Sequence, residues 1–260
     1  MQERYEPGCP CRRLIGGVWT EDAVSLAEEC RLSVFVDGQP FSTLFCTPAE
    51  PAELIYGHLL TEKKITCRKQ VQTLTLDESG LPDALTASVT LSVIARSAAT
   101  WQSVPPSVIA RSEATWQSVP FVQTAAPNDP PRTVWTPEQL QILFDHVVRD
   151  ALSTRGGHST HSCTLMLDGE ILCTREDIGR HNALDRAAGW ALLHDVPLPR
   201  CLAFFSGRVS TEAVTKAAAA GLTVLCAKAL PTAQAVRLAK QLGLTLLHLS
   251  GGRGLMRFTP

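Results

Sequence analysis

The sequence predicts a mixed α/β protein, in which a small α+β unit precedes a larger α/β unit built on a sheet with parallel strands. Short apolar runs flank an Asp-Gly pair at 37–38 and again at 168–169. Such pairs readily take the positive φ angles of a tight turn, which predicts two β-hairpins. After residue 183, short apolar runs alternate with helical patterns. This alternation is typical of parallel strands joined by crossover helices.

The N-terminal unit is expected to contain two pairs of strands and a helix. Residues 32–36 and 41–45 form the first hairpin. Residues 71–76 and 85–93 alternate between apolar and polar side chains, as strands do. Residues 51–61 carry apolar side chains at helical spacing and are expected to form the helix.

A near-exact internal repeat separates the two units. Residues 92–105 recur as residues 107–120 with a single mismatch. Structural repeats normally diverge, and repeat folds need about three copies or more, so the pair is interpreted as a recent insertion. Because a segment rich in Pro, Asn and Asp follows, we expect residues 92–134 to be a poorly ordered insertion and linker. The flanking domains are then 1–91 and 135–260.

The C-terminal unit is expected to alternate helices and strands. Thr136 is a candidate helix N-cap, and an apolar stripe continues from it to Leu152. Residues 163–167 and 171–174 form the second hairpin. The remaining elements are helices over 183–193, 211–220 and 231–242 and strands over 201–205, 223–227 and 245–249. Short buried strands joined by helices form a sheet with helices on its faces.

Three cations follow the ends of three successive strands. Arg208 lies in Ser-Gly-Arg after the first strand, Lys228 directly follows the second, and Arg253 lies in Gly-Gly-Arg-Gly after the third. The carboxyl ends of parallel strands meet at one edge of a sheet, where ligands gather. Glycine lets backbone N–H groups approach an anion, and Arg offers a fork for phosphate oxygens. The edge is predicted to bind a phosphate-bearing ligand, unless the glycines only make turns and the cations are only solvated.

The densest run of polar and charged side chains covers residues 175–185, where a strand leads into a helix. Asp177 could cap that helix, because a carboxylate accepts N–H bonds there. Arg180 and His181 could reach the predicted pocket from the start of the helix. The run is either an ordinary solvated helix start or one wall of a ligand pocket, and the neighbouring strand-end cations favour the wall.

Composition excludes several classes of protein. The net charge of -1 gives no overall field for nucleic acid or an anionic membrane surface, and no apolar run approaches the roughly 18 residues of a membrane span. Nine cysteines without regular spacing suit reduced thiols in the cytoplasm. We expect Cys9 and Cys11 on a mobile tail and most of the others buried. His158, His161 and Cys163 lack the spacing of a zinc site, and no metal is predicted.

Several stretches together carry a family resemblance. They are Gly-His-Leu-Leu-Thr-Glu at 57–62, the segment 156–162, Glu-Asp-Ile-Gly-Arg-His within 175–185, Ser-Gly-Arg at 206–208, Lys-Ala-Ala at 216–218, Pro-Thr at 231–232 and the segment 251–259. With these stretches the chain resembles the FdhD family of sulfur carrier proteins, which are needed to mature formate dehydrogenases. The resemblance implies a three-layer, cytidine-deaminase-like α/β domain without the deaminase zinc ligands, preceded by a smaller α+β domain.

The resemblance also implies a reaction and its partners. Family members take persulfide sulfur from a cysteine desulfurase and deliver it to the molybdenum cofactor in its bis(molybdopterin guanine dinucleotide) form, and they are usually homodimers. The stretch that contacts the cofactor in the family matches Leu249, Ser250, Gly251, Gly252, Arg253 and Gly254. The predicted cofactor site consists of these residues together with Arg208, Lys228, Arg180 and His181.

The chain departs from the family pattern in one respect. The family carries its sulfur on a C-x-x-C pair in the loop between the two domains, whereas this chain has no cysteine between Cys67 and Cys163. Sulfur transfer requires a thiolate. Either the protein is a working sulfurtransferase that uses another thiol, with Cys9 or Cys11 as candidates, or it is a non-catalytic cofactor-binding scaffold or decayed paralogue. The missing pair favours lost or impaired transfer, and no catalytic residue is predicted.

Overall fold

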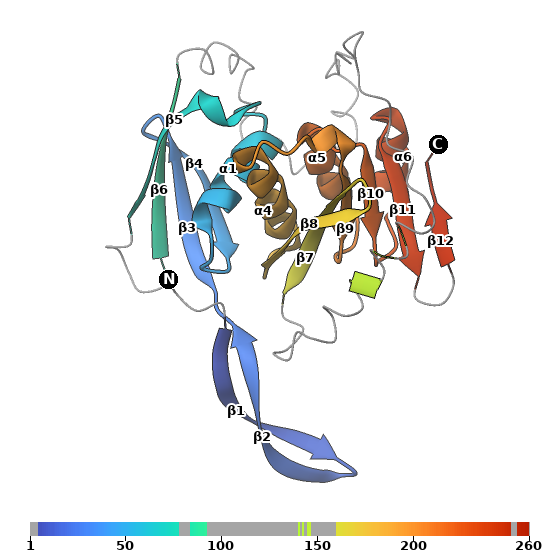
Figure 1. The fold of residues 1–260 in the computed structure, drawn as a ribbon. Helices are drawn as coiled ribbons and strands as arrows, with labels where there is room; N and C mark the ends of the chain where they lie inside the picture. Colours follow the sequence, from blue (N-terminus) through green and yellow to red (C-terminus); the bar gives the residue numbers. More distant parts are fainter. Residues whose placement is uncertain are drawn as a thin grey trace.

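The computed structural model describes residues 5–77, 84–92, 160–250 and 254–259, together with Leu140, Ile142, Asp145 and His146. In this part of the chain a four-stranded and a six-stranded sheet stand apart with helices between them, and a two-stranded hairpin projects from the body (Figure 1). The expected insertion, 92–134, lies outside the described residues apart from Ser92. The division into two domains stays a prediction. No described helix is long and apolar enough to cross a membrane.

The projecting hairpin consists of β1 (Tyr5–Ile15) and β2 (Val18–Ala27). The expectation of a mobile N-terminal tail is wrong, because Cys9 and Cys11 lie in β1 and pair with residues of β2. Polar side chains occupy both faces of these strands, so the sequence shows no apolar alternation. Opposite charges instead pair across the hairpin and stabilise it, at Arg12–Glu21 and Arg13–Asp22.

The first sheet has the strand order β4-β3-β6-β5. Its strands are β3 (Cys30–Val36), β4 (Gln39–Cys46), β5 (Val71–Asp77) and β6 (Ala84–Leu91), with a short 3-10 helix (Arg68–Gln70) before β5. The expected turn at Asp37-Gly38 is confirmed, since both residues have positive φ. The parallel pairing of β3 with β6 was not expected, because alternation identifies strands but not their neighbours.

The second sheet has the order β12-β11-β10-β9-β7-β8. Its strands are β7 (His161–Leu167), β8 (Glu170–Asp177), β9 (Leu202–Phe205), β10 (Val224–Ala227), β11 (Thr245–Ser250) and β12 (Gly254–Arg257). The expected parallel strands are confirmed, since β9, β10 and β11 run in the same direction. β7 is antiparallel to both of its neighbours, β8 and β9, so β8 runs in the same direction as β9. The antiparallel edge strand β12 was not expected.

Three helices cover one face of the second sheet. They are α4 (Arg180–Leu193), α5 (Thr211–Ala219) and α6 (Ala233–Gln241), with a 3-10 turn at Leu198–Arg200. A fourth helix, α1 (Pro51–Thr61), follows the first hairpin of the four-stranded sheet. The buried residues of α4, α5 and α6 share a core with Leu165 and Leu246 of the sheet. These helices connect β8 to β9, β9 to β10 and β10 to β11, so each connection crosses the sheet in the same direction. Right-handed crossovers in one direction place their helices on the same side of the sheet.

The opposite face of the second sheet has its own buried cluster. Leu140 packs there with Met166 and Phe204. Most of the helix expected after Thr136 lies outside the described residues. The three-layer arrangement therefore stays a prediction.

α1 and α4 cross so closely that neither has room for a side chain at the crossing. A Cβ on Gly57 would overlap the carbonyl group of Asp185, and one on Gly189 would overlap the carbonyl group of Glu53. Glycine allows this approach because it has no Cβ. The buried core therefore continues through the crossing, from Leu32 in β3 to the second sheet.

Candidate functional site

One edge of the second sheet gathers the ends of four strands and the starts of three helices. β8, β9, β10 and β11 all point toward it, and α4, α5 and α6 follow the first three of these strands. Helix N-termini present free N–H groups and a dipole that favours anions. We call this place the strand-end edge. It is where the sequence predicts a phosphate-bearing ligand.

The predicted cations Arg180, Arg208 and Lys228 lie exposed at the strand-end edge. The start of α4 meets the loop after β9, since a Cβ added to Gly207 would lie 3.1 Å from the Arg180 Cβ. The backbone of Lys228 lies beside the same loop, because its N–H donates to the carbonyl oxygen of Phe205 at 3.1 Å. Among the described residues, no carboxylate oxygen lies within 4.0 Å of these three cationic groups. Their charges are available to an anionic ligand.

His181 is held between two residues of the α5 start. Its Nδ1 lies 2.9 Å from the Glu212 carboxylate, and its Nε2 lies 3.3 Å from the Ser210 hydroxyl oxygen. Ser210 is also the N-cap of α5 and accepts a hydrogen bond from the backbone N–H of Ala213. The hydrogen bond from His181 lowers the pKa of Glu212. The His181 ring is therefore fixed at the edge rather than free to swing.

His161, at the start of β7, belongs to the same edge and was not predicted there. β7 runs against β9, so its first residue lies beside the strand ends. Burial lowers the pKa of His161, and the charges of Arg180 and His181 lower it further. A neutral ring at pH 7 can donate one hydrogen bond and accept another. The sequence shows His161 only as an unspecific metal candidate, because strand order decides its neighbours.

The family's cofactor-contacting stretch is described in part. Leu249 and Ser250 end β11 at the strand-end edge, and Ser250 pairs with Gly254 at the start of β12. Gly251, Gly252 and Arg253 lie outside the described residues. The part that is described stands beside the loops that carry Arg208 and Lys228, because β9, β10 and β11 are neighbours.

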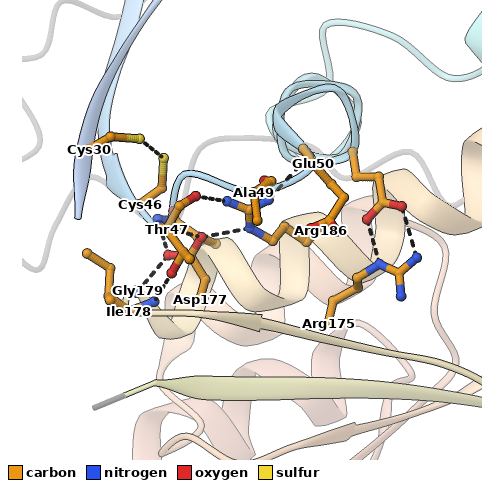
Figure 2. Close-up of polar contacts among 12 residues, drawn as sticks. Cys30, Cys46, Thr47, Ala49, Glu50, Arg175, Asp177, Ile178, Gly179 and Arg186 are labelled. Atoms are coloured by element: carbon orange, nitrogen blue, oxygen red, sulfur yellow. Dashed lines mark hydrogen bonds and ion pairs between the residues drawn. The ribbon is translucent and has the colours of Figure 1, made fainter. Parts of the chain in front are cut away.

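The run at 175–185 divides between the edge and the interior. Arg180 and His181 lie at the edge, whereas Asp177 is fully buried. Asp177 does not cap α4: the N-cap is Gly179, without a side-chain cap. The Asp177 carboxylate instead accepts hydrogen bonds from Arg186 Nε at 2.7 Å and from the Gly179 backbone N–H at 2.9 Å (Figure 2). Arg186 itself is 1% exposed, so this ion pair is an interior one.

Thr47, which follows β4, ties the first sheet to this ion pair (Figure 2). Its backbone N–H donates to Asp177 at 3.3 Å, and its hydroxyl oxygen accepts from the Ile178 N–H at 3.2 Å. Its carbonyl oxygen accepts from Arg186 Nη2 at 2.5 Å. Arg186 also donates to the carbonyl oxygen of Ala49. We call Thr47, Asp177, Ile178 and Arg186 the buried joint, since they fasten the two sheets together.

Arg175 makes a second connection between the two parts of the chain. Its Nε and Nη2 donate to the two carboxylate oxygens of Glu53 in α1, at 2.5 and 2.9 Å (Figure 2). Such a two-pronged pair fixes orientation as well as distance. Arg175 therefore holds α1 on β8 and does not reach the strand-end edge.

Asp185 lies in a third polar cluster, buried between α1, α4 and α5. Lys216 Nζ lies 2.9 Å from Asp185 and 2.9 Å from Glu62. His58 Nδ1 lies 3.2 Å from the same Asp185 oxygen, and the Thr61 hydroxyl donates to the other oxygen at 2.8 Å. Burial alone would raise the pKa of Asp185, but the hydrogen bond from His58 and the charge of Lys216 outweigh it and hold that pKa below its usual value.

Lys216→Met is expected to lower the melting temperature at pH 7, because removing one partner of a buried ion pair costs about 3 kcal/mol or more. In the wild-type chain the depressed folded-state pKa of Asp185 contributes stability at neutral pH that is lost as pH falls through that pKa. Without Lys216, only the interactions with His58 and Thr61 oppose burial, so this pKa is higher than in the wild-type chain and acid removes less stability here. The difference in melting temperature should therefore shrink between about pH 5 and pH 3.

Thermal unfolding followed by circular dichroism from pH 7 to pH 3 measures this difference. Lys240→Met, at an exposed position in α6, controls for the loss of a lysine and should change little at any pH. A Lys216→Met effect of constant size over this range would contradict the coupling to Asp185.

A hollow of about 280 Å³ lies elsewhere, at the turn between β3 and β4. Its lining includes Val36, Phe41, Lys64 and Leu91, and it contains no residue of the strand-end edge. Of its described lining residues only Lys64 is cationic, so these residues lack the convergent charges of an anion site. The strand-end edge is therefore the candidate functional site.

Comparison with known proteins identifies the family. The family model for FdhD/NarQ matches residues 27–260. The chain belongs to the FdhD/NarQ family. The match begins at the last residue of β2, so the projecting hairpin precedes the part that defines the FdhD/NarQ family.

Relatives named sulfur carrier protein FdhD match most of the chain. The one from Halalkalibacterium halodurans is 32% identical over 232 residues, which cover 88% of this chain and 83% of the relative. The one from Geobacillus kaustophilus is 31% identical over 253 residues, covering 96% and 94%. A crystal structure described as a formate dehydrogenase accessory protein, from Desulfotalea psychrophila, superimposes with a TM-score of 0.71 at 18% identity, covering 99% of this chain and 98% of the other. That likeness shows a shared fold.

Proposed function

We propose that the protein is a cytoplasmic, homodimeric sulfur carrier for formate dehydrogenase, which passes sulfur from a cysteine desulfurase to the molybdenum cofactor in its bis(guanine dinucleotide) form. The observation that carries the proposal is the strand-end edge, where three exposed cations meet three helix N-termini. The names of the relatives support sulfur carriage and a role alongside formate dehydrogenase.

The strand-end edge suits a guanine dinucleotide cargo because each dinucleotide carries a pyrophosphate. Guanidinium groups of Arg180 and Arg208 can take phosphate oxygens in pairs. The N-cap of α4, Gly179, has no side chain to cap the helix, so the first N–H groups of α4 remain for an anion. His161 and His181 add hydrogen-bonding groups beside these cations. We propose Leu249, Ser250, Gly251, Gly252, Arg253 and Gly254, with Arg208, Lys228, Arg180 and His181, as the residues that bind the cargo.

Arg208→Ala and Arg253→Ala are each expected to weaken the binding of guanosine diphosphate about tenfold, because a charge-assisted hydrogen bond to phosphate is removed. Titration calorimetry measures the affinity. Arg237→Ala is the matched control, since Arg237 lies in α6 and its guanidinium donates to Gln234. Equal affinities for the Arg208 variant and the wild type would overturn the placement of the cargo at this edge.

Sulfur carriage needs a thiol that a desulfurase can reach. Cys67 is exposed, Cys9 and Cys11 are half-buried, and the other six cysteines are buried. Burial raises the pKa of Cys201 to about 11 and that of Cys173 to about 12, which leaves little thiolate at neutral pH. Cys9, Cys11 and Cys67 are therefore the candidates for attack on the outer sulfur of a desulfurase persulfide, with the desulfurase thiolate as leaving group.

Incubation with a cysteine desulfurase and cysteine, followed by intact mass spectrometry, tests sulfur carriage. We expect the wild-type chain to gain one sulfur atom that a reducing thiol removes. Cys9→Ser/Cys11→Ser and Cys67→Ser should show which thiol carries it. A wild-type chain that gains no labile sulfur would refute the carrier role.

A cofactor-binding scaffold or decayed paralogue is the second candidate. The absence of any cysteine between Cys67 and Cys163 favours it. It retains the strand-end edge and loses the sulfur chemistry. Guanosine diphosphate binding that depends on Arg208, together with no sulfur uptake, is the result that this alternative predicts.

A further inference from the structure

A pair of buried thiols lies outside the proposed function. The Sγ atoms of Cys30 and Cys46 are 3.5 Å apart, and the two residues are only 4% and 2% exposed. They stand directly opposite each other in the β3–β4 ladder, beside the buried joint (Figure 2). We propose that Cys30 and Cys46 form a reversible disulfide, a redox-modification site that closes the base of the β3–β4 hairpin next to the buried joint.

The backbone already has the geometry of a disulfide. Residues opposite each other in an antiparallel pair have Cα atoms about 4.5 to 5.5 Å apart, inside the range that disulfides span. An S–S bond is about 2.05 Å long, so closing the observed gap takes less than about 1 Å of movement by each sulfur. Rotation of the two side chains supplies this movement, and the strands keep their register.

Either of two oxidants can take the two electrons that disulfide formation between Cys30 and Cys46 releases. With hydrogen peroxide, two S–H bonds and the O–O bond break, one S–S bond and two O–H bonds form, and two water molecules leave. With an oxidised low-molecular-weight disulfide, one thiolate attacks, releases one small thiolate and gives a mixed disulfide, and the second thiolate then displaces the other small thiolate. Both routes remove two electrons from the protein, and a dithiol reductant returns them. Cytoplasmic disulfides of this kind are typically transient and redox-sensing.

The surroundings of the pair make its oxidation slow. The hydrogen bond with Cys30 raises the pKa of Cys46, and burial and the charge of Asp177 raise it further. Only the thiolate reacts, so the rate should increase about tenfold for each pH unit between about pH 7 and pH 9. Cys67, which is exposed, should react first with bulky thiol reagents.

The disulfide would stiffen the connection between the sheets. Cys46 directly precedes Thr47, whose backbone N–H donates to Asp177 and whose hydroxyl accepts from Ile178. With Cys46 bonded to Cys30, the end of β4 can no longer move away from β3. The Thr47 and Ile178 amides should then exchange with solvent more slowly in the oxidised protein than in the reduced one.

Peptide mapping of the full chain tests the bond directly. Trypsin cleaves after Arg31, so Cys30 lies in the peptide 14–31 and Cys46 in the peptide 32–63. After treatment of the native protein with hydrogen peroxide or oxidised glutathione, we expect these two peptides joined, with a mass about 2 Da below their sum. The melting temperature should increase by roughly 5 to 10 °C, and a dithiol reductant should reverse both changes.

Cys30→Ala and Cys46→Ala should abolish the joined peptide and the increase in melting temperature, whereas Cys67→Ser should keep both. The mapping of the wild-type chain does not depend on these variants folding. Separate peptides with alkylated Cys30 and Cys46 after oxidation would overturn the proposal. So would a stable glutathione adduct on either residue, because it would mean that the second thiol does not reach the first sulfur.

Discussion

Arg186→Met should remove about 4 kcal/mol from the free energy of unfolding, the largest loss that we predict for a single substitution. Methionine keeps much of the volume but leaves the Asp177 carboxylate buried without its cation. Breaking a buried ion pair by removing one partner costs about 3 to 5 kcal/mol. The carbonyl oxygens of Thr47 and Ala49, which Arg186 now satisfies, lose a donor as well.

Urea denaturation followed by fluorescence measures this loss. Arg237→Met, at an exposed position in α6, is the matched control and should change stability by less than about 0.5 kcal/mol. Arg186→Met/Asp177→Asn should recover part of the loss, because the unpaired charge is then gone. If Arg186→Met were as stable as Arg237→Met, the buried joint would not hold the two sheets together.

Gly57→Ala should destabilise the protein by about 3 kcal/mol, near the upper end for overpacking. The added methyl group would overlap the backbone of Asp185, and backbone cannot move aside as a flexible side chain can. α1 would have to shift away from α4. That shift would also loosen the Lys216–Asp185 pair, since Lys216 connects the two helices through Asp185 and Glu62.

The control for Gly57→Ala is Gly17→Ala. Nothing lies within 4 Å of a Cβ at Gly17, where only the positive φ of 84° opposes alanine. That conformation costs about 1 to 2 kcal/mol. Thermal unfolding of both variants measures the difference, and equal losses would show that the helix crossing tolerates a methyl group.

The strands and helices of the described chain follow closely from sequence patterns. Asp-Gly pairs located both hairpin turns, and short apolar runs located β9, β10 and β11. Strand order did not follow, because alternation says nothing about which strands are neighbours. The hairpin β1–β2 and the edge strand β12 were missed, because neither buries a regular apolar face.

The predicted cations Arg180, Arg208 and Lys228 share one edge because the strands that lead to them run the same way. The sequence could not show which residues of the run at 175–185 are buried and which are exposed. Asp177 and Arg180 are three residues apart, yet one is buried and the other exposed. The difference depends on Arg186 and Thr47, and Thr47 reaches Asp177 only through tertiary packing. Lys216 likewise resembles an ordinary solvated helix residue until α1 packs over it.

The buried joint also explains how the chain can accommodate its duplicated segment. Thr47 and Asp177 are 130 residues apart in the sequence, so folding must close a very long loop whether or not the second copy is present. That copy adds about 15 residues to the loop, and closure entropy grows only with the logarithm of length. The extra cost is about 0.1 kcal/mol at 25 °C. The second copy therefore costs the fold almost nothing in stability.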